Sequence, residues 1–268
     1  MEVNADDMVI KSDSEEEMLA DIEETLGRLQ AINLKLNPRK CSFGVKEGIY
    51  STHLITKQGI RADPSKVKAI SALQPPKTVS KIQSFSKKLA SLNRFLSKSA
   101  EKALPFMKTL KSCTSEKMVQ WTTEANEAFR RMKECLESLP TMVIPTKGET
   151  LIVYLAVSKR NVSAILMAKR GKKQAPVYFV SRILHGAEQK YLELENLILT
   201  LMYAARKLRR YFQAHPIQVL SDMSIKQVLE KPEKSGRVAK WAIELGGHEI
   251  EFKGRNLIKE QILTDFLA

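Results

Sequence analysis

Residues 151–181 read LIVYLAVSKRNVSAILMAKRGKKQAPVYFVS, and this stretch decides the fold. It contains three short apolar runs, at Leu151–Val157, Val162–Ala168 and Pro176–Ser181, separated by basic turns. Short apolar runs bounded by turn residues are typical of buried strands, so we expect three consecutive strands here. The first run, at seven residues, is the longest unbroken apolar run of the chain. A membrane-spanning helix needs about 20 such residues, so no membrane segment is expected.

The sequence that follows mixes helical and strand patterns. Apolar residues at steps of three and four predict one long helix over Ala187–Gln213. Beyond Pro216 the pattern predicts, in order, a strand at Ile217–Ser221, helices at Ser224–Leu229 and Arg237–Leu245, a strand at Glu249–Lys253 and a helix at Leu257–Ala268. The resulting order, β-β-β-α-β-α-α-β-α, predicts an α/β fold.

Upstream of residue 148 the pattern is mainly helical. Cys41–Arg61 is strand-like and broken by glycines, and the stripes that contain Met18, Leu26 and Phe85 are expected to be core. Helices are predicted at Ser12–Asn33, from Asp63 to Pro75, and at Val79–Leu96, Glu101–Leu110 and Glu124–Leu139. The change of texture near residue 148 therefore predicts a boundary between two parts.

Charge gives the first indication of a partner. With 43% hydrophobic and 28% charged residues the chain is globular in composition, and its net charge is +14. Residues 1–30 hold ten acids and two bases, a sum of −8, so the remainder carries +22. Such a surplus attracts a polyanion, which favours nucleic acid, although a basic protein without a special partner has the same charge. The acidic start matches no secretory or transit peptide, and three widely spaced cysteines fit a reducing compartment.

Three acids of the second half stand in apolar surroundings. Glu195 is one residue off the apolar stripe of the long helix, Asp222 follows a strand, and Asp265 lies in the apolar segment ILTDFL. Clustered carboxylates stay ionised only when cations or hydrogen bonds compensate them, and Mg²⁺ suits carboxylate ligands. The alternative is that each acid is an ordinary helix cap or rim residue.

Several motifs in one order resemble a known family. The chain is similar to the polymerase polyprotein of gypsy-type long-terminal-repeat (LTR) retrotransposons, particularly plant members. In the first part the resemblance lies in Asn4–Asp7, Leu36–Phe43, Gly59–Val67 and Trp121–Phe129; in the second part it lies in Leu155–Ser158, Tyr191–Glu195, Leu220–Asp222 and Thr264–Phe266.

The resemblance implies three segments. Residues 1–62 would be a truncated remnant of the reverse transcriptase palm, and residues 63–148 a helical thumb, connection and linker. Residues 149–268 would be an RNase H-like domain, with a mixed five-stranded sheet and flanking helices. The partners implied are an RNA–DNA hybrid or another nucleic acid and other chains of the same polyprotein, in the cytoplasm or the nucleus.

The resemblance also assigns roles to acids. Glu195, Asp222 and Asp265 would hold Mg²⁺ or Mn²⁺ for hydrolysis of an RNA–DNA hybrid, and Asp6 and Asp7 would be a polymerase vestige. Family members have a further Asp on the first strand, at the position of Ala156 here. Because that carboxylate bridges both metals, we expect weak or absent hydrolysis. We expect no polymerase activity from this chain alone, since a third palm carboxylate and the fingers do not precede Met1.

Six basic residues are candidates for binding the nucleic-acid backbone: Arg206, Lys207, Arg209, Arg210, Arg237 and Lys240. A solvated helix face is the alternative, and for Trp241 a place in the core is preferred. A second reading of the whole chain is a catalytically dead, basic nucleic-acid-binding relic.

Overall fold

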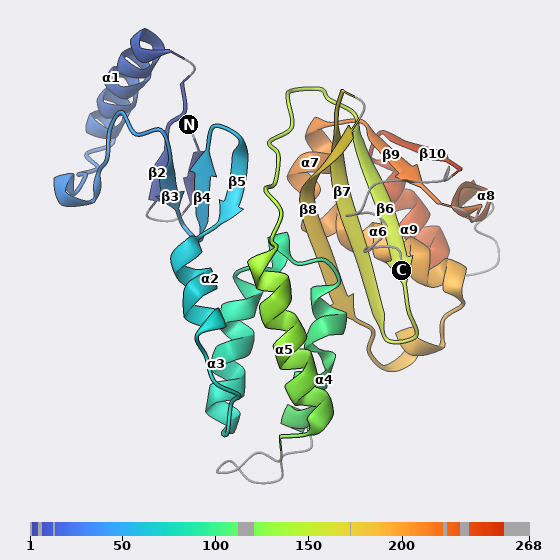
Figure 1. The fold of residues 1–268 in the computed structure, drawn as a ribbon. Helices are drawn as coiled ribbons and strands as arrows, with labels where there is room; N and C mark the ends of the chain where they lie inside the picture. The colour runs from blue at the N-terminus through green and yellow to red at the C-terminus, as the bar shows by residue number, and fades with distance from the viewer. Residues whose placement is uncertain are drawn as a thin grey trace.

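The computed structural model describes residues 2–4, 7–12, 14–111, 121–171, 173–221, 224–230 and 236–254. At its centre is a five-stranded mixed sheet with the order β10-β9-β6-β7-β8 (Figure 1). β6 pairs antiparallel with β7 and parallel with β9, which in turn pairs parallel with β10. The strands are β6 (Leu151–Val157), β7 (Asn161–Arg170), β8 (Lys173–Ile183), β9 (Ile217–Leu220) and β10 (Ile250–Lys253). The α/β fold class and the first three predicted strands are therefore confirmed.

Both faces of this sheet are apolar, because successive side chains of a strand point to opposite sides. Leu151, Val153 and Leu155 of β6 belong to one buried cluster, whereas Ile152 and Tyr154 belong to another. A sheet buried on both faces needs a layer of helices on each of them. The near-continuous apolar sequence of the strands is the direct consequence.

The first face is covered by helices that follow β8 in the chain. Ile198 and Leu201 of one helix and Phe212, Val238 and Leu245 of others complete its cluster. The elements of this part are η3 (Gly186–Lys190), α6 (Glu193–Lys207), α7 (Arg209–Ala214), α8 (Ile225–Glu230) and α9 (Gly236–Gly246).

The second face is covered by helices that precede the sheet in the chain. Phe85, Phe106 and Phe129 form the aromatic centre of a cluster that also contains Ile152 and Tyr154 of β6. The helices are α2 (Pro64–Ser71), α3 (Val79–Ala90), η2 (Asn93–Phe95), α4 (Ser99–Lys111) and α5 (Thr123–Glu137), with α4 beside β8 (Figure 1). One continuous core therefore joins the helical part to the sheet.

A third layer of the molecule lies at the N-terminal side. The elements are β1 (Glu2–Asn4), β2 (Asp7–Val9), α1 (Glu15–Ala31), η1 (Pro38–Lys40), β3 (Gly48–Tyr50), β4 (His53–Thr56) and β5 (Gly59–Ala62). β1 and β2 form a two-stranded sheet, and β3, β4 and β5 form a three-stranded antiparallel one. None of the helices in the described ranges is long and apolar enough to span a membrane.

Three expectations from the sequence need correction. The long helix predicted from Ala187 begins only at Glu193, after the separate 3₁₀ helix η3, and it breaks at Leu208, whose backbone leaves the helical region. The helix predicted to end at Leu96 ends at Ala90 and is followed by η2, which turns Phe95 into the core. Leu26 is 45% exposed rather than core, whereas its neighbour Thr25 is the buried residue of α1. The predicted final helix, Leu257–Ala268, lies outside the described residues.

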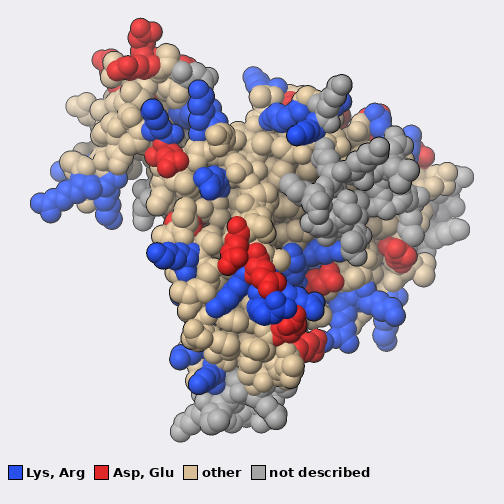
Figure 2. Space-filling model, viewed as in Figure 1, with Lys and Arg blue, Asp and Glu red and all other residues tan. Residues whose placement is uncertain are grey.

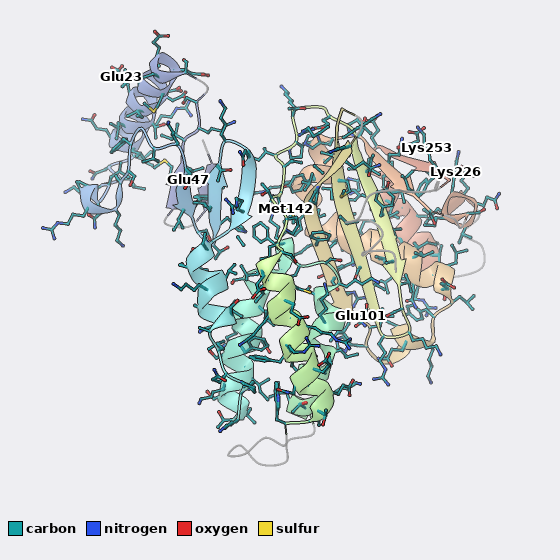
Figure 3. The ribbon with its side chains drawn as sticks, viewed as in Figure 1. Glu23, Glu47, Glu101, Met142, Lys226 and Lys253 are labelled. Carbon is teal, nitrogen blue, oxygen red and sulfur yellow. The ribbon has the colours of Figure 1, made fainter. Side chains whose placement is uncertain are left out.

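One short connection ties the N-terminal sheet to the central sheet. The backbone of Ile60 in β5 exchanges two hydrogen bonds with Met142, at 2.7 and 2.8 Å, and Val143 donates to the Pro176 carbonyl at 2.8 Å. Met142 lies between β5 and β8 in Figure 3. The approach depends on Gly59, whose φ is +140° and whose missing Cβ would lie 2.1 Å from the Met142 carbonyl oxygen.

Replacing Gly59 with Ala is expected to lower the free energy of unfolding by more than about 1 kcal/mol, because the backbone conformation and the close carbonyl both exclude a methyl group. Gly27→Ala is the matched control. It adds the same methyl group to α1 in open space, where Ala is expected to stabilise the helix by up to about 1 kcal/mol. Urea denaturation measures both. Equal effects of the two substitutions would contradict the role given to Gly59.

His53 predicts a pH dependence of folding. Burial, together with the nearby cations Arg94 and Lys66, lowers the pKa of His53 from 6.5 to about 4, and its ring lies 5.4 Å from that of Phe95. Because protonation then favours the unfolded chain, the contribution of His53 is complete above pH 6.5 and is lost as the pH falls toward about 4. Urea denaturation at about pH 7 and about pH 5 is expected to show a smaller loss of stability in His53→Gln than in the wild type. An equal loss in both proteins would contradict this assignment.

Candidate functional site

Glu195 is the one predicted RNase H-type carboxylate whose surroundings the structure describes. It lies in the first turn of α6, where its Oε2 accepts a hydrogen bond from the Leu192 backbone N–H at 3.3 Å. Its Oε1 accepts one from Nη2 of Arg237 at 3.4 Å, and its side chain is 18% exposed. Both oxygens of this carboxylate therefore have protein donors.

Arg237 reaches Glu195 from the first turn of α9. Its guanidinium carbon lies 4.1 Å from the centre of the Tyr191 ring, a cation–π arrangement. The Tyr191 ring is in turn 6.5 Å from that of Trp241. Trp241 is partly buried against the cluster of the first face, as expected for a core residue.

The other predicted acids lie outside the described residues. This holds for Asp222, which follows β9, for Asp265 and for Asp6, while Asp7 is described only as the β2 residue that pairs with Asn4. Ala156 pairs with Ser163 across β6 and β7, and its methyl group packs against the cluster of the second face. The structure thus describes one of the three expected carboxylates.

The described residues by themselves do not make up a divalent metal site. Mg²⁺ is bound through carboxylates together with water and substrate oxygens. Here Glu195 faces a guanidinium and Ala156 offers no donor. No group of three or more His, Cys, Asp or Glu residues within the described ranges could hold a metal ion.

The six basic candidates divide into two groups. Arg206 makes a two-pronged ion pair with Glu244 of α9, each N–O distance being 2.7 Å, and Arg237 pairs with Glu195. Among the described residues no carboxylate lies within ion-pair distance of the exposed Lys207, Arg209 or Lys240; Arg210 is exposed as well. Two of the six, Arg206 and Arg237, therefore have carboxylate partners at the surface.

A second basic surface escaped the sequence analysis. Residues 64–100 contain no Asp or Glu and eight basic residues: Lys66, Lys68, Lys77, Lys81, Lys87, Lys88, Arg94 and Lys98. Lys81, Lys87 and Lys88 are exposed on α3, outside the stripe formed by the buried Ile82, Phe85 and Leu89. The signal that could have found this surface is the local charge, which the sum over the whole chain concealed.

The neighbouring helix α5 carries charges of a different kind. Arg130 and Arg131 both pair with Glu127, and Arg130 also pairs with Glu134. Figure 2 shows Lys and Arg side chains intermingled with Asp and Glu over this helix. The hydrogen bonds from the two arginines lower the pKa of Glu127 to about 2. The positive charge of α5 is compensated within the protein, unlike that of α3.

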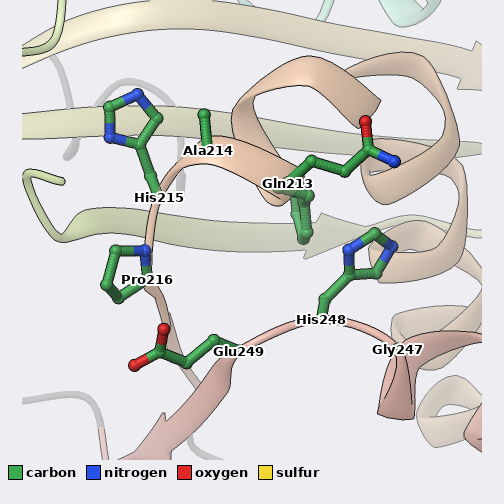
Figure 4. A pocket seen from close by; sticks show the side chains of 8 residues that line it. Gln213, Ala214, His215, Pro216, Gly247, His248 and Glu249 are labelled. Carbon is green, nitrogen blue, oxygen red and sulfur yellow. The ribbon is translucent and has the colours of Figure 1, made fainter. Parts of the chain in front are cut away.

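One cavity of the protein is lined by two histidines and does not include Glu195. This cavity of about 250 Å³ is lined by residues of the α7 end and of the segment before β10, including His215 and His248 (Figure 4). His215 Nδ1 lies 3.0 Å from the Glu149 carbonyl oxygen, and the His248 ring packs edge-on against Phe212. The cavity stands at the N-terminal ends of β9 and β10, whereas Asp222 follows the C-terminal end of β9.

Comparisons with known proteins agree with this fold. Residues 121–219 match the model of the RNase H-like domain found in reverse transcriptase. The chain is 28% identical over 270 residues to a retrovirus-related Pol polyprotein from transposon 297 of Drosophila melanogaster, covering 99% of this chain and 25% of that protein. It is 23% identical over 256 residues to the transposon Tf2-3 polyprotein of Schizosaccharomyces pombe, covering 93% and 19%. The chain therefore spans about a quarter or less of the length of these curated relatives.

Solved structures share the architecture over nearly the whole chain. A foamy viral protease-reverse transcriptase in complex with an RNA/DNA hybrid superposes with a TM-score of 0.78 at 18% identity, covering 94% of this chain and 35% of that one. A foamy viral protease-reverse transcriptase dRH in complex with double-stranded DNA gives a TM-score of 0.77 at 19% identity and covers 94% of this chain and 45% of that one. The chain is thus similar in sequence to transposon Pol polyproteins and, over residues 121–219, to the RNase H-like domain found in reverse transcriptase, and it shares the fold of the foamy viral structures.

Proposed function

We propose that this protein binds RNA–DNA hybrids through the basic surfaces of its helical part and of its RNase H-like domain, and that its hydrolysis of them is weak or absent. The observation that carries the proposal is a set of exposed cations, namely Lys81, Lys87 and Lys88 on α3 together with Lys207 and Arg209, for which no carboxylate partner is found among the described residues. We further propose that it derives from a gypsy-type, plant-type element, with segments 1–62, 63–148 and 149–268 as palm remnant, thumb and connection, and RNase H-like domain.

The uncompensated cations support binding because a polyanion recovers the cost of placing like charges together. Lys81, Lys87 and Lys88 are exposed side chains of α3, and Lys207 and Arg209 lie at the junction of α6 and α7. Each lysine or arginine that neutralises a phosphate also releases counterions, which makes binding strongly salt-dependent. RNA–DNA hybrids present closely spaced phosphates and 2′-hydroxyls that a protein can read by shape. The foamy viral relative in complex with an RNA/DNA hybrid has the same fold, which supports this substrate class.

The state of the carboxylates supports weak hydrolysis. In the proposed assignment Glu195, Asp222 and Asp265 would hold Mg²⁺ or Mn²⁺, which would activate water and stabilise the leaving oxygen. The first-strand position is Ala156, and Glu195 already has a guanidinium partner. The loss of a bridging ligand is expected to cost on the order of 10³-fold in rate. Asp6 and Asp7 would be a polymerase vestige, to which we assign no step.

A catalytically dead, nucleic-acid-binding relic is the second candidate function. The ion pair of Glu195 with Arg237 favours it, because a carboxylate paired with a guanidinium is a poorer metal ligand than a free one. The two candidates share hybrid binding and differ only in residual hydrolysis.

Binding is tested by neutralising the α3 face. We expect the triple variant Lys81→Gln, Lys87→Gln, Lys88→Gln to bind a labelled RNA–DNA hybrid at least about tenfold more weakly and with a flatter salt dependence, because up to three phosphate contacts are lost. The control is Arg130→Gln with Arg131→Gln, which removes cations already paired with Glu127. Fluorescence anisotropy at several salt concentrations measures both. Equal binding by the triple variant and the wild type would exclude α3 from the interface.

Hydrolysis is tested at the first-strand position. Ala156→Asp is expected to raise any residual cleavage of a labelled hybrid in Mg²⁺, because it supplies the missing carboxylate. The control is Ala156→Asn, because Asn has nearly the same volume as Asp but carries no charge. We expect this variant to cleave the hybrid at the rate of the wild type. Cleavage by the wild type at a rate typical of an active RNase H would refute the proposed impairment. No cleavage by either variant would favour the dead relic.

A further inference from the structure

We propose that Arg237 takes the place of a metal ion at Glu195, so that this corner of the domain excludes divalent cations while the two side chains are paired. The inference rests on the proposed assignment of Glu195 as an RNase H-type carboxylate. It deepens the proposed function by giving a physical cause, besides Ala156, for weak hydrolysis.

Glu195 already faces two hydrogen-bond donors of the protein. Its Oε2 accepts from the Leu192 N–H at 3.3 Å and its Oε1 accepts from Arg237 at 3.4 Å. At 18% exposure, the carboxylate has little open surface at which an ion could enter with its water shell. Mg²⁺ gives up its water reluctantly, so a partly covered carboxylate with a bonded cation is a poor ligand for it.

The position of Arg237 in α9 is unfavourable for a cation that has no anionic partner. Arg237 lies in the first turn of α9, where the helix dipole disfavours a positive side chain. Glu195 compensates that cation, and the first turn of α6 is in turn favourable for an anion. Each side chain therefore supplies the charge that the other one needs.

An aromatic ring and a second ion pair between α6 and α9 hold the Arg237 guanidinium in place. The Tyr191 ring lies beneath it, with 4.1 Å between the guanidinium carbon and the ring centre. Toward the other end of α9, Glu244 binds Arg206 of α6 with two N–O distances of 2.7 Å. Two ion pairs of opposite orientation thus link α6 to α9, and they fix the start of α9 beside Glu195.

The ion pair of Arg237 with Glu195 opposes the binding of a divalent cation at Glu195. A divalent cation at Glu195 would have to displace Arg237 or lie beside it. In the second case the positive charges of the cation and of the guanidinium would repel each other. A displaced Arg237, whose side chain is 51% exposed, would lose its contact with Glu195 and turn toward solvent. The pair therefore acts as an internal substitute for the metal rather than as one of its ligands.

The test measures Mn²⁺ binding by electron paramagnetic resonance and by thermal shift, without nucleic acid. Four proteins are compared: the wild type, Arg237→Gln, Arg237→Gln with Glu195→Gln, and Lys240→Gln. Lys240→Gln is the matched control, because it removes one exposed positive charge from the same helix, three residues further on.

We expect the wild type and Lys240→Gln to show weak Mn²⁺ binding, and Arg237→Gln to bind at least about tenfold more tightly, by release of the carboxylate. The gain is expected to vanish in the double variant. Equal Mn²⁺ affinity in the wild type and Arg237→Gln, or an equal gain in Lys240→Gln, would overturn the proposal.

Tyr191→Leu keeps the proposal falsifiable if Arg237→Gln does not fold. It removes the ring beneath the guanidinium and is expected to give a smaller gain in Mn²⁺ affinity of the same sign; no gain would count against the proposal. Hybrid binding in the presence of a chelator is measured separately. If the wild type did not bind the hybrid, the proposed function would be contradicted, and the Mn²⁺ result would be unaffected.

Discussion

The structure depends on one constraint, which is that the central sheet is apolar on both faces. β6 alone sends Leu151, Val153 and Leu155 into one core and Ile152 and Tyr154 into the other. Exposure of either face would cost roughly 25 cal/mol for each Å² of apolar surface, so helices must cover both. The helices after β8 cover one face and those before β6 cover the other. For this reason the RNase H-like sheet and the helical part share a single core.

The packing of the helices also determines where charged side chains are exposed. Helices that bury one face turn the other to solvent, and on α3 that outer face carries lysines without acids. On α5 and between α6 and α9, arginines pair with glutamates instead. A net charge of +14 is thus the sum of compensated and uncompensated surfaces, and only the latter can attract nucleic acid.

Much of the fold could be predicted from the sequence, because strand and helix periodicities are local. The strands of residues 151–183 and the start of α2 at Pro64, capped by Asp63, follow from such patterns. The break at Leu208 could not be predicted, since the apolar stripe continues through it and tertiary packing decides it. Exposure of Leu26 escaped prediction for a similar reason: a stripe indicates an apolar face but not what covers it. The ion pair of Glu195 with Arg237 joins residues 42 positions apart, which no local pattern reveals.

The account rests most on the state of the Glu195 carboxylate, and a crystal structure grown in Mn²⁺ tests it most directly. Anomalous scattering locates the metal without reference to activity. The account predicts no Mn²⁺ peak at Glu195 and a guanidinium of Arg237 in contact with it. A Mn²⁺ ion at a ligand distance of about 2 Å from Glu195, with Arg237 turned away, would contradict it.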